Sequence, residues 1–333
     1  MDASATIKDK FRGCLLGGLM GDVIGAAVEG ESAAYIRKQF PTMESILKAG
    51  TIEEAFGAPW VVGRYTDDTQ MTLGVAEWLC EDEEPSGLAL LNRFQEQFDP
   101  TRRYGPGVEQ ILRLHESTSN WTQLARCMFP DGSYGNGSAM RVAPVGLKYH
   151  DNLSVLVEVA ISSSLTTHCH PLAQQGAVLQ AVAVASAIRK SEIAVGHFVR
   201  PLRMALQLIE RRGQDIGDFS RSLDFIEAGI VKRRSCRQMA SVFGTGVAAV
   251  EAVPMALYCF IQNSSSFERT IHDAVSLGGD TDTIASMAGA LSGAWLGSSA
   301  IPSAWLQSTK EPKDLIRYIT DLADRLFGSI VRV

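Results

Sequence analysis

The sequence contains little that would support a disulfide-bonded or nucleic-acid-binding protein. Its six cysteines include no C-x-x-C pair, and two of them, Cys14 and Cys259, lie within apolar stretches. Buried thiols in a reducing compartment explain this placement better than a disulfide framework does. The 333 residues include 31 basic and 37 acidic ones, for a formal net charge of −6. The chain therefore lacks the basic surplus of a protein that binds phosphate backbones.

Sequence features of secretion and of membrane spans are also missing. The first residues, MDASATIKDKFRG, contain no apolar core of a signal peptide. The apolar run from Gly13 to Val28 is too short for a membrane span and contains Asp22. We therefore expect an intracellular, cytoplasmic protein that binds no membrane and no nucleic acid, and we expect it to be a monomer.

Strand patterns are nearly absent, and helical spacing takes their place. Apolar residues recur at helical intervals over 69–81, 176–190, 198–212, 244–262 and 313–330. At about 150 residues per domain the length would allow two domains, but no loop is long enough to be a convincing linker. The sequence predicts an all-α fold.

Two of the predicted helices carry a small residue at every fourth position. The stripes are Gly13, Gly17, Gly21 and Gly25 near one end of the chain, and Ala285, Gly289, Gly293 and Gly297 near the other. Residues four apart share one helix face, and glycine on that face lowers helix stability. The cost is explained if another backbone lies against each stripe, so we expect these two helices to be central.

Two acidic clusters open predicted helices. They consist of Thr66, Asp67, Asp68 and Thr69 in YTDDTQM, and of Asp280, Asp282 and Thr283 in SLGGDTDT. Asp and Thr are common N-caps and suit the positive end of the helix dipole, so capping explains either cluster alone. A cap needs one side-chain oxygen, however, whereas each cluster supplies two carboxylates and neighbouring hydroxyls.

If the two striped helices are central, both acidic helix starts can open onto one site. Two like charges about 4 Å apart repel by about 4 kcal/mol at an effective dielectric constant near 20. Such a cluster must take up protons or bind cations. Oxygen ligands without thiolate or imidazole favour Mg²⁺, Mn²⁺ or Ca²⁺ over zinc. We predict a dinuclear Mg²⁺ site, with Mn²⁺ as the alternative ion.

A glycine-rich loop, two acidic residues and two histidines are also relevant to the site. Glycines in GSYGNG, at 132–137, permit an anion-binding nest of backbone amides, although an ordinary turn is the alternative. Glu29 ends the first striped helix and is a candidate acid/base group or metal ligand, whereas Asp22 fits a buried hydrogen-bond anchor. His168 and His170, two residues apart, face different directions in a helix and do not form a metal pair.

Segments in order along nearly the whole chain are similar to those of one family: GCLLGGLMGDVIGAAVEG, YTDDTQM, YGPGV, GSYGNGSAMRVAP, LTTHCHP, GTGVAAVEAVPMALYCF and SLGGDTDTIASMAGAL. The chain resembles the ADP-ribosylglycohydrolases, which include the dinitrogenase reductase-activating glycohydrolase and the vertebrate ADP-ribosyl-acceptor hydrolases. T-D-D-T and G-G-D-T-D-T together are highly specific. The resemblance implies one compact, orthogonal multi-helix domain over residues 1–333, with two Mg²⁺ or Mn²⁺ ions in a cleft.

The resemblance also implies roles for particular residues. Glu29 would lie on a mobile loop over the site and act on the scissile bond, with Asp67 and Asp282 as further catalytic candidates. The metal ligands would be Thr66, Asp67, Asp68, Asp280, Asp282 and Thr283. The substrate-binding residues would be Gly107, Phe129, Gly132, Ser133, Tyr134, Gly135, Asn136, His168 and Gly246. Phe129, or Met128 if the alignment shifts by one residue, would stack on adenine, and His168 would reach the ribose.

The implied reaction is hydrolysis of the α-glycosidic bond between ADP-ribose and an acceptor, so the partners would be ADP-ribosylated proteins or ADP-ribose derivatives. GSYGNG and AVPMALYCF resemble the branch that acts on ADP-ribosyl-serine, poly(ADP-ribose) and O-acetyl-ADP-ribose. GNGSAMRVAP is similar to bacterial members, some of which act on ADP-ribosyl-arginine. Two other functions remain as alternatives, a non-catalytic ADP-ribose-binding module and a metal-dependent phosphoesterase.

Overall fold

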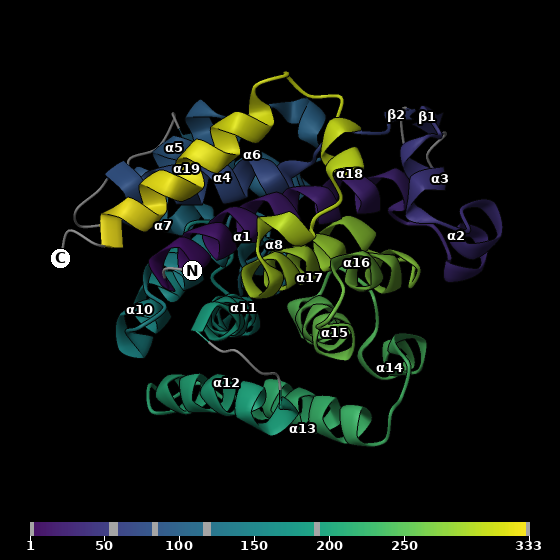
Figure 1. Cartoon of the computed structure of the whole chain (residues 1–333). Helices are drawn as coiled ribbons and strands as arrows, with labels where there is room; N and C mark the ends of the chain where they lie inside the picture. The colour runs from purple at the N-terminus through teal and green to yellow at the C-terminus, as the bar shows by residue number, and fades with distance from the viewer. Residues whose placement is uncertain (1–2, 53–58, 82–85, 116–120, 190–193, 331–333) are drawn as a thin grey trace.

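The computed structural model confirms the all-α prediction (Figure 1). It describes residues 3–52, 59–81, 86–115, 121–189 and 194–330. Within these ranges, the sheet is one antiparallel pair, β1 (Thr51–Ile52) with β2 (Trp60–Val61). The helices are α1 (Ala3–Gly25), α2 (Ala33–Gln39), α3 (Met43–Leu47), α4 (Asp67–Glu81), α5 (Gly87–Glu96), α6 (Pro106–Leu114), α7 (Trp121–Leu124), α8 (Gly137–Met140), α9 (Ala143–Lys148), α10 (Leu153–Leu165), α11 (Pro171–Arg189), α12 (Val195–Glu210), α13 (Gly217–Val231), α14 (Cys236–Phe243), α15 (Ala249–Gln262), α16 (Phe267–Val275), α17 (Thr281–Leu296), α18 (Ser303–Gln307) and α19 (Leu315–Ile330), with short 3₁₀ turns η1 (Ala26–Val28), η2 (Pro100–Arg102) and η4 (Ser298–Ala300).

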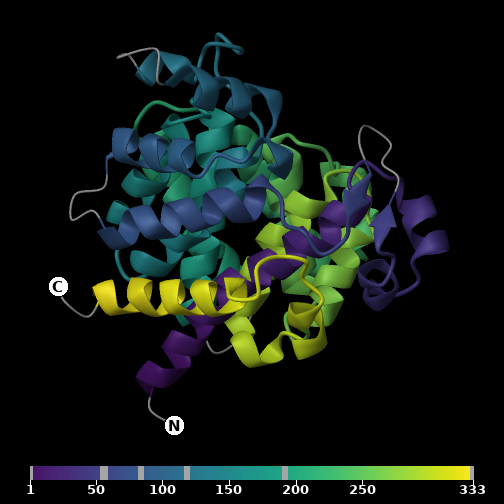
Figure 2. The ribbon, with the colours of Figure 1, turned by 90° about the horizontal axis from the view of Figure 1, so that it is seen from above.

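The two helices that carry the small-residue stripes, α1 and α17, lie side by side in the middle of the molecule. Figure 1 shows α1 crossing the centre, with α19 on one side of it and α12 and α13 on the opposite side, and Figure 2 shows α19 passing over α1. A methyl group added at Gly17 would overlap the carbonyl oxygen of Gly289, and one added at Gly289 would overlap that of Gly17. The prediction that the stripes face another backbone is therefore confirmed, and each stripe is the other's partner.

The pairing is antiparallel and repeats every four residues. Gly13 lies against Gly293, and Gly21 lies against Ala285. At the far end, the hydroxyl of Thr281 donates to the carbonyl of Gly25 at 2.8 Å. The start of α17 is thereby brought to the end of α1, where Glu29 follows after η1.

Two helices are long and apolar enough to cross a membrane by length and composition alone. They are Ile7–Val28, with 22 residues, and Pro171–Arg189, with 19 residues. The first of these helices is longer than the apolar run Gly13–Val28, because it begins at Ile7. Burial is the better discriminator, since 89% of the tested window of each helix is buried inside the protein.

The predicted start of the helix over 244–262 is wrong. The pattern over 244–262 indicates a continuous helix, but α14 ends at Phe243 and α15 begins at Ala249. Gly244 has φ +88° and closes α14, while the carboxylate of Glu251 accepts the amide of Gly246 at 2.8 Å. The intervening residues form a loop that pairs with the glycine-rich loop, through Asn136 N–H to the carbonyl of Val247 at 2.9 Å.

Candidate active site

The first acidic cluster is held in place by Asp22 of α1. Both carboxylate oxygens of Asp22 accept the amide of Thr66 at 3.1 Å, and Oδ2 accepts the amide of Thr69 at 3.0 Å. The hydroxyls of Thr66 and Thr69 also donate to Asp22, at 2.9 and 2.5 Å. Asp22 is fully buried and satisfies the amides that a helix start leaves without partners. It is the buried anchor that the sequence indicates, and it leaves Asp67 and Asp68 available for other contacts.

The second acidic cluster follows a tight glycine turn. Gly278 and Gly279 have φ of +74° and +80°, and a Cβ at either would overlap backbone atoms of Glu31 or Thr245. Only glycine fits such a backbone without strain. The amide of Gly279 donates to the carbonyl of Glu31 at 3.1 Å, and the amide of Gly30 donates to the carbonyl of Gly279 at 2.9 Å. These bonds tie the segment that carries Glu29 to the residues that precede Asp280.

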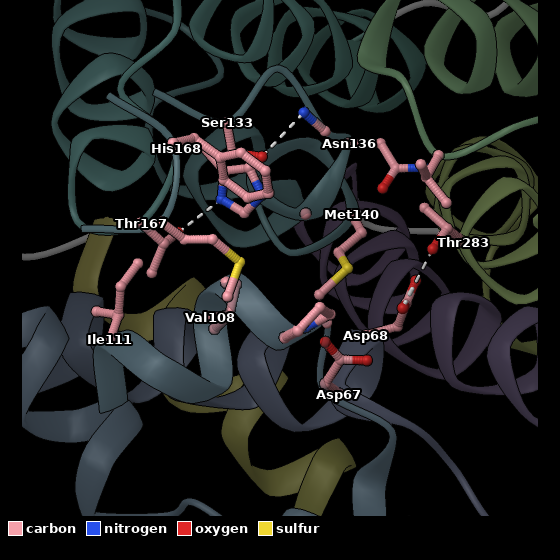
Figure 3. A pocket seen from close by; sticks show the side chains of 18 of the residues that line it. Asp67, Asp68, Val108, Ile111, Ser133, Asn136, Met140, Thr167, His168 and Thr283 are labelled. Carbon is pink, nitrogen blue, oxygen red and sulfur yellow. Dashed lines mark hydrogen bonds between the residues drawn. The ribbon is translucent and has the colours of Figure 1, made fainter. Parts of the chain in front are cut away.

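The two clusters meet in one pocket of about 260 Å³. One carboxylate oxygen from each of Glu29, Asp280 and Asp282 lies within 4.8 Å of the others. Asp67 and Asp68 line the same pocket, and Asp68 Oδ2 accepts a hydrogen bond from the hydroxyl of Thr283 at 3.3 Å, which joins α4 to α17 (Figure 3). The predicted convergence of the two helix starts is therefore present in the structure.

Five ionised carboxylates without a bound cation are electrostatically unfavourable in this pocket. Burial raises the pKa values of Asp67, Asp68 and Asp282 well above the ordinary value, and the neighbouring carboxylates raise them further. Burial also raises the pKa of Glu29, and Asp280 adds to this effect, although the nearby Arg103 opposes it. Asp68 Oδ1 is buried and has no hydrogen-bond partner among the residues that the structure describes. A cluster of this kind binds protons or cations, and its all-oxygen donors are those that Mg²⁺ and Mn²⁺ prefer.

The opposite end of the pocket is apolar. Val108 and Ile111 of α6 and Leu124 of α7 line it. Figure 3 shows Val108 and Ile111 on the same side as Thr167 and away from Thr283. At the mouth, Phe129 is 44% exposed and packs against Gly107, while Met128 is 39% exposed and also lines the pocket. Both candidates for stacking on adenine thus lie at this apolar end.

His168 lies beside Thr167 in Figure 3, and its ring is held in one orientation. Its Nδ1 lies 2.7 Å from the hydroxyl of Thr167, and its backbone amide donates to the carbonyl of Ser164 at 2.7 Å. Its ring packs against Gly137. Burial lowers the pKa of His168 to about 3, and the charge of Arg141 contributes. His168 is therefore neutral near pH 7 and can form a hydrogen bond with a sugar hydroxyl without carrying charge.

Two backbone amides of the glycine-rich loop already donate hydrogen bonds within the protein. The amide of Gly135 donates to the hydroxyl of Ser133 at 3.2 Å, and the amide of Asn136 donates to the carbonyl of Val247. An inward-facing nest that includes these two amides is therefore not formed. The side chain of Asn136 instead donates to Asp280 Oδ2 at 2.6 Å, which ties the loop to the acidic end of the pocket.

Most of the residues predicted from the sequence line this pocket: Glu29, Asp67, Asp68, Gly107, Phe129, Ser133, Gly135, Asn136, His168, Asp280, Asp282 and Thr283. Four predicted residues are placed differently. The hydroxyl of Thr66 is turned toward Asp22, and Gly132 packs against Cys169 and His170. Tyr134 is 57% exposed, and Gly246 is held by Glu251.

Among the lining residues that were not predicted, three lie beside polar side chains of the site. Met140 lies between the acidic cluster and His168 in Figure 3, and Thr167 orients the His168 ring. Arg103 contacts Glu29 at 3.1 Å. Thr167 could have been noticed because it directly precedes His168, whereas nothing in DPTRRYGPG indicates which of its two arginines faces the pocket.

Comparisons with known proteins agree with this geometry. A sequence profile of the ADP-ribosylglycohydrolase family matches residues 3–332. The chain is 34% identical to ADP-ribosylhydrolase ARH3 of Mus musculus over 332 residues, which cover 90% of this chain and 87% of that protein. It is 35% identical to ADP-ribosylhydrolase ARH3 of Gallus gallus over 331 residues, covering 90% and 88%.

A solved structure shares the fold. A chain of an ADP-ribosylglycohydrolase-related protein complex superimposes with a TM-score of 0.70 at 24% identity, covering 98% of this chain and 99% of that one. The profile match and the two relatives identify the family as well as the fold. The chain belongs to the ADP-ribosylglycohydrolase family and is a hydrolase that acts on ADP-ribose glycosidic bonds.

Proposed function

We propose that this hydrolase works with two divalent cations, Mg²⁺ or Mn²⁺, held between the starts of α4 and α17. Thr66, Asp67 and Asp68 on one side and Asp280, Asp282 and Thr283 on the other would hold them. The observation that carries the proposal is the convergence of Glu29, Asp280 and Asp282 within 4.8 Å in a pocket that Asp67 and Asp68 also line. The unpartnered, buried Asp68 Oδ1 fits a metal ligand. When bound, the ions would neutralise the carboxylates and polarise the oxygens that contact them.

Different parts of the pocket would bind different parts of the substrate. The acceptor-linked ribose would occupy the acidic end, beside Asp280 and Asp282. The loop that contains Ser133 and Asn136 would lie along the diphosphate and distal ribose, with neutral His168 donating or accepting one hydrogen bond. The adenine ring would lie against the apolar wall, under Phe129 or Met128.

Glu29 is the proposed acid/base residue, with Asp67 and Asp282 as alternatives. In the reaction, the bond between C1″ of the ribose and the acceptor atom breaks, and a water oxygen forms the new bond to C1″. The departing acceptor takes up a proton and the water loses one. A carboxyl whose pKa is raised by burial is suited to deliver that proton, and carboxylates near the ring stabilise positive charge on it in the transition state.

The acceptor is proposed to be serine in ADP-ribosylated proteins, poly(ADP-ribose) or O-acetyl-ADP-ribose, with ADP-ribosyl-arginine as the alternative. The resemblance of GSYGNG and AVPMALYCF to the branch with the first specificities supports this choice. The ion pair between Glu29 and Arg103 in the pocket bears on the alternative.

We further propose that residues 1–333 form one domain and act as a cytoplasmic monomer without membrane or nucleic-acid partners. A single core cluster that runs from Phe11 to Leu326 supports the single domain. The six cysteines, all of them free thiols, support a reducing compartment.

Product analysis with a substrate panel tests the proposal. Peptides ADP-ribosylated on serine or arginine, poly(ADP-ribose) and O-acetyl-ADP-ribose would be incubated after chelation, with and without added Mg²⁺ or Mn²⁺. Release of intact ADP-ribose that requires the added ion is the expected result. AMP with ribose phosphate would indicate a phosphoesterase, and tight ADP-ribose binding without turnover would indicate a binding module.

The Glu29 assignment has a separate test. The Glu29→Gln variant should bind ADP-ribose like the wild type and lose at least about 100-fold in kcat, the scale of general acid/base catalysis. Full turnover of this variant would transfer the role to one of the aspartates.

A further inference from the structure

Among the residues that the structure describes, Arg103 is the only arginine or lysine that lines the pocket. Its guanidinium lies over the ring of Trp60, with Cζ 3.7 Å from the ring centroid. Nη1 donates to the carbonyl of Ala26 at 2.7 Å and to Glu29 Oε2 at 3.1 Å. One cation therefore holds both the backbone of η1 and the side chain proposed for acid/base work.

The backbone at Arg103 is unusual for an arginine. Its φ of +60° is in the left-handed region, which residues other than glycine adopt at a cost in free energy. Its neighbour Arg102 points elsewhere, because it contacts Glu311 and lies over the ring of Tyr65. Because of this left-handed conformation, the side chains of two consecutive arginines point in different directions. Backbone strain of this kind concentrates at functional sites.

The Glu29 side chain contacts Arg103 and lies close to two aspartates. The Glu29 side chain is 38% exposed, and that of Arg103 is 18% exposed. On the other side of Glu29, Asp280 and Asp282 lie within 4.8 Å and repel an ionised carboxylate. Without Arg103, the Glu29 side chain would be free to rotate away from those aspartates into solvent.

We propose that Arg103 positions Glu29 for the reaction and makes the site select neutral acceptors, such as a serine hydroxyl, over a guanidinium acceptor. The inference rests on the proposed function, in which Glu29 acts at the scissile bond. An arginine acceptor keeps its positive charge and needs a carboxylate partner. Glu29 is already paired with Arg103, and the charge of Arg103 repels a second guanidinium, so recognition of arginine is opposed twice.

The test compares Arg103→Gln with the wild type on serine-linked and arginine-linked ADP-ribosyl peptides, with kcat and KM measured separately. We expect kcat on the serine-linked peptide to fall by about tenfold. The arginine-to-serine ratio of kcat/KM should rise by about tenfold, because the repelling charge is gone. The Kd of free ADP-ribose, which lacks an acceptor, should change by less than about twofold.

Two further variants separate positioning from charge and from folding. Arg103→Lys keeps the charge but loses the planar contacts with Trp60 and Glu29, so it should still reject the arginine-linked peptide while recovering only part of kcat. Arg103→Gly removes the backbone strain and supplies a folded variant without the cation if glutamine is not tolerated. It should show the kcat loss and the raised ratio of the glutamine variant.

Arg64→Gln is the matched control. Arg64 also lies near the Trp60 ring, 5.5 Å from its centroid, but it donates to Thr101 on the surface and does not line the pocket. Both its kcat and its acceptor ratio should equal those of the wild type. An Arg103→Gln enzyme with wild-type kcat would overturn the positioning role, and an unchanged acceptor ratio would overturn the selectivity. Neither outcome is the same as failure of the wild type to release ADP-ribose from any substrate, which would reject the proposed function itself.

Discussion

At the scale of single residues, two buried aspartates of the site differ in the partners that they have. Asp22 accepts hydrogen bonds from the amides and hydroxyls of Thr66 and Thr69, so its carboxylate is satisfied within the fold. Asp68 is equally buried, but its Oδ1 has no hydrogen-bond partner within the described part of the chain. The first side chain therefore serves the fold, and the second has a carboxylate oxygen available to a ligand.

Substituting the two aspartates by asparagine should give opposite results. Asp68→Asn removes a buried, repelled charge, so the metal-free protein should become more stable by about 1 kcal/mol, while Mg²⁺ affinity and turnover fall at least about 100-fold. Asp22→Asn places a side-chain NH2 group opposite hydrogen-bond donors, which leaves donors without an acceptor. This variant should lose about 3 kcal/mol of unfolding free energy. Urea unfolding in EDTA, calorimetric Mg²⁺ titration and turnover measure these effects. An Asp68→Asn protein that binds Mg²⁺ normally would remove Asp68 from the ligand set.

The buried, neutral His168 should make the folded protein less stable at acidic pH. The pKa of His168 is lowered to about 3 in the folded protein, against about 6.5 in an unfolded chain. Its contribution to stability is therefore fully present above about pH 6.5 and is lost as pH falls toward 3. At pH 5 the loss amounts to about 2 kcal/mol, from about 1.4 kcal/mol for each pH unit below 6.5.

Two measurements check the His168 prediction. The NMR signals of its ring should not titrate between about pH 5 and pH 8. A His168→Gln variant should lose less stability than the wild type between pH 6.5 and pH 5. A midpoint near pH 6.5 for the His168 ring would contradict the buried, neutral state.

At the scale of helices, contact between α1 and α17 sets the distance between the parts of the site. Backbone touches backbone along the whole stripe from Gly13 to Gly25, and the acidic cluster of α17 begins where this stripe ends. A displacement of α17 along or away from α1 therefore moves Asp280 and Asp282 relative to Glu29.

Gly17→Ala should separate the two helices in their middle. The added methyl would overlap the carbonyl of Gly289, so we expect a loss of about 2–3 kcal/mol of unfolding free energy together with weaker Mg²⁺ binding. Gly328→Ala in α19 is the matched control, because a Cβ there meets no atom of the described residues within 4 Å. It should stabilise the protein by up to about 1 kcal/mol, the difference in helix propensity. Equal stability changes for the two variants would reject close packing of the stripes.

The stripes and the acidic helix starts are the parts of the site that the sequence allows one to predict. Both are local patterns, in which residues four apart share a face and Asp or Thr precedes a helix. The break between α14 and α15 is not predictable in this way, because the carboxylate of Glu251 and the glycine-rich loop compete for its backbone. Arg103 escapes sequence analysis for the same reason, since its direction depends on a single left-handed residue and on Trp60 from a distant segment.

At the scale of the whole molecule, the fold concentrates charge of one sign at its centre. The carboxylates of the pocket come from segments more than 200 residues apart, and α4, α17 and the end of α1 bring them together. A core of this kind is stable only if protons or cations compensate the charge. The stability of the protein should therefore depend jointly on pH and on divalent cations.

The direction of this dependence follows from the raised pKa values. An aspartate in the unfolded chain has a pKa of about 3.9, whereas those of Asp67, Asp68 and Asp282 lie well above this in the folded protein without metal. From about pH 4 upward the folded state then holds more protons than the unfolded state, so these groups lower the stability of the metal-free protein as pH rises. Bound Mg²⁺ favours the ionised carboxylates and reverses their effect.

The difference in Tm between protein in Mg²⁺ and protein in EDTA isolates these groups, because charges elsewhere contribute to both samples equally. We expect the difference to be close to zero near pH 4 and to grow steadily toward pH 7, where saturating Mg²⁺ at about 100 times Kd adds about 2.7 kcal/mol per site. In Asp68→Asn the growth with pH should be much smaller, because one ligand and one repelled charge are gone. A difference that stays the same across this range would mean that Mg²⁺ binds outside the pocket, since only a site built from these carboxylates couples cation binding to their ionisation.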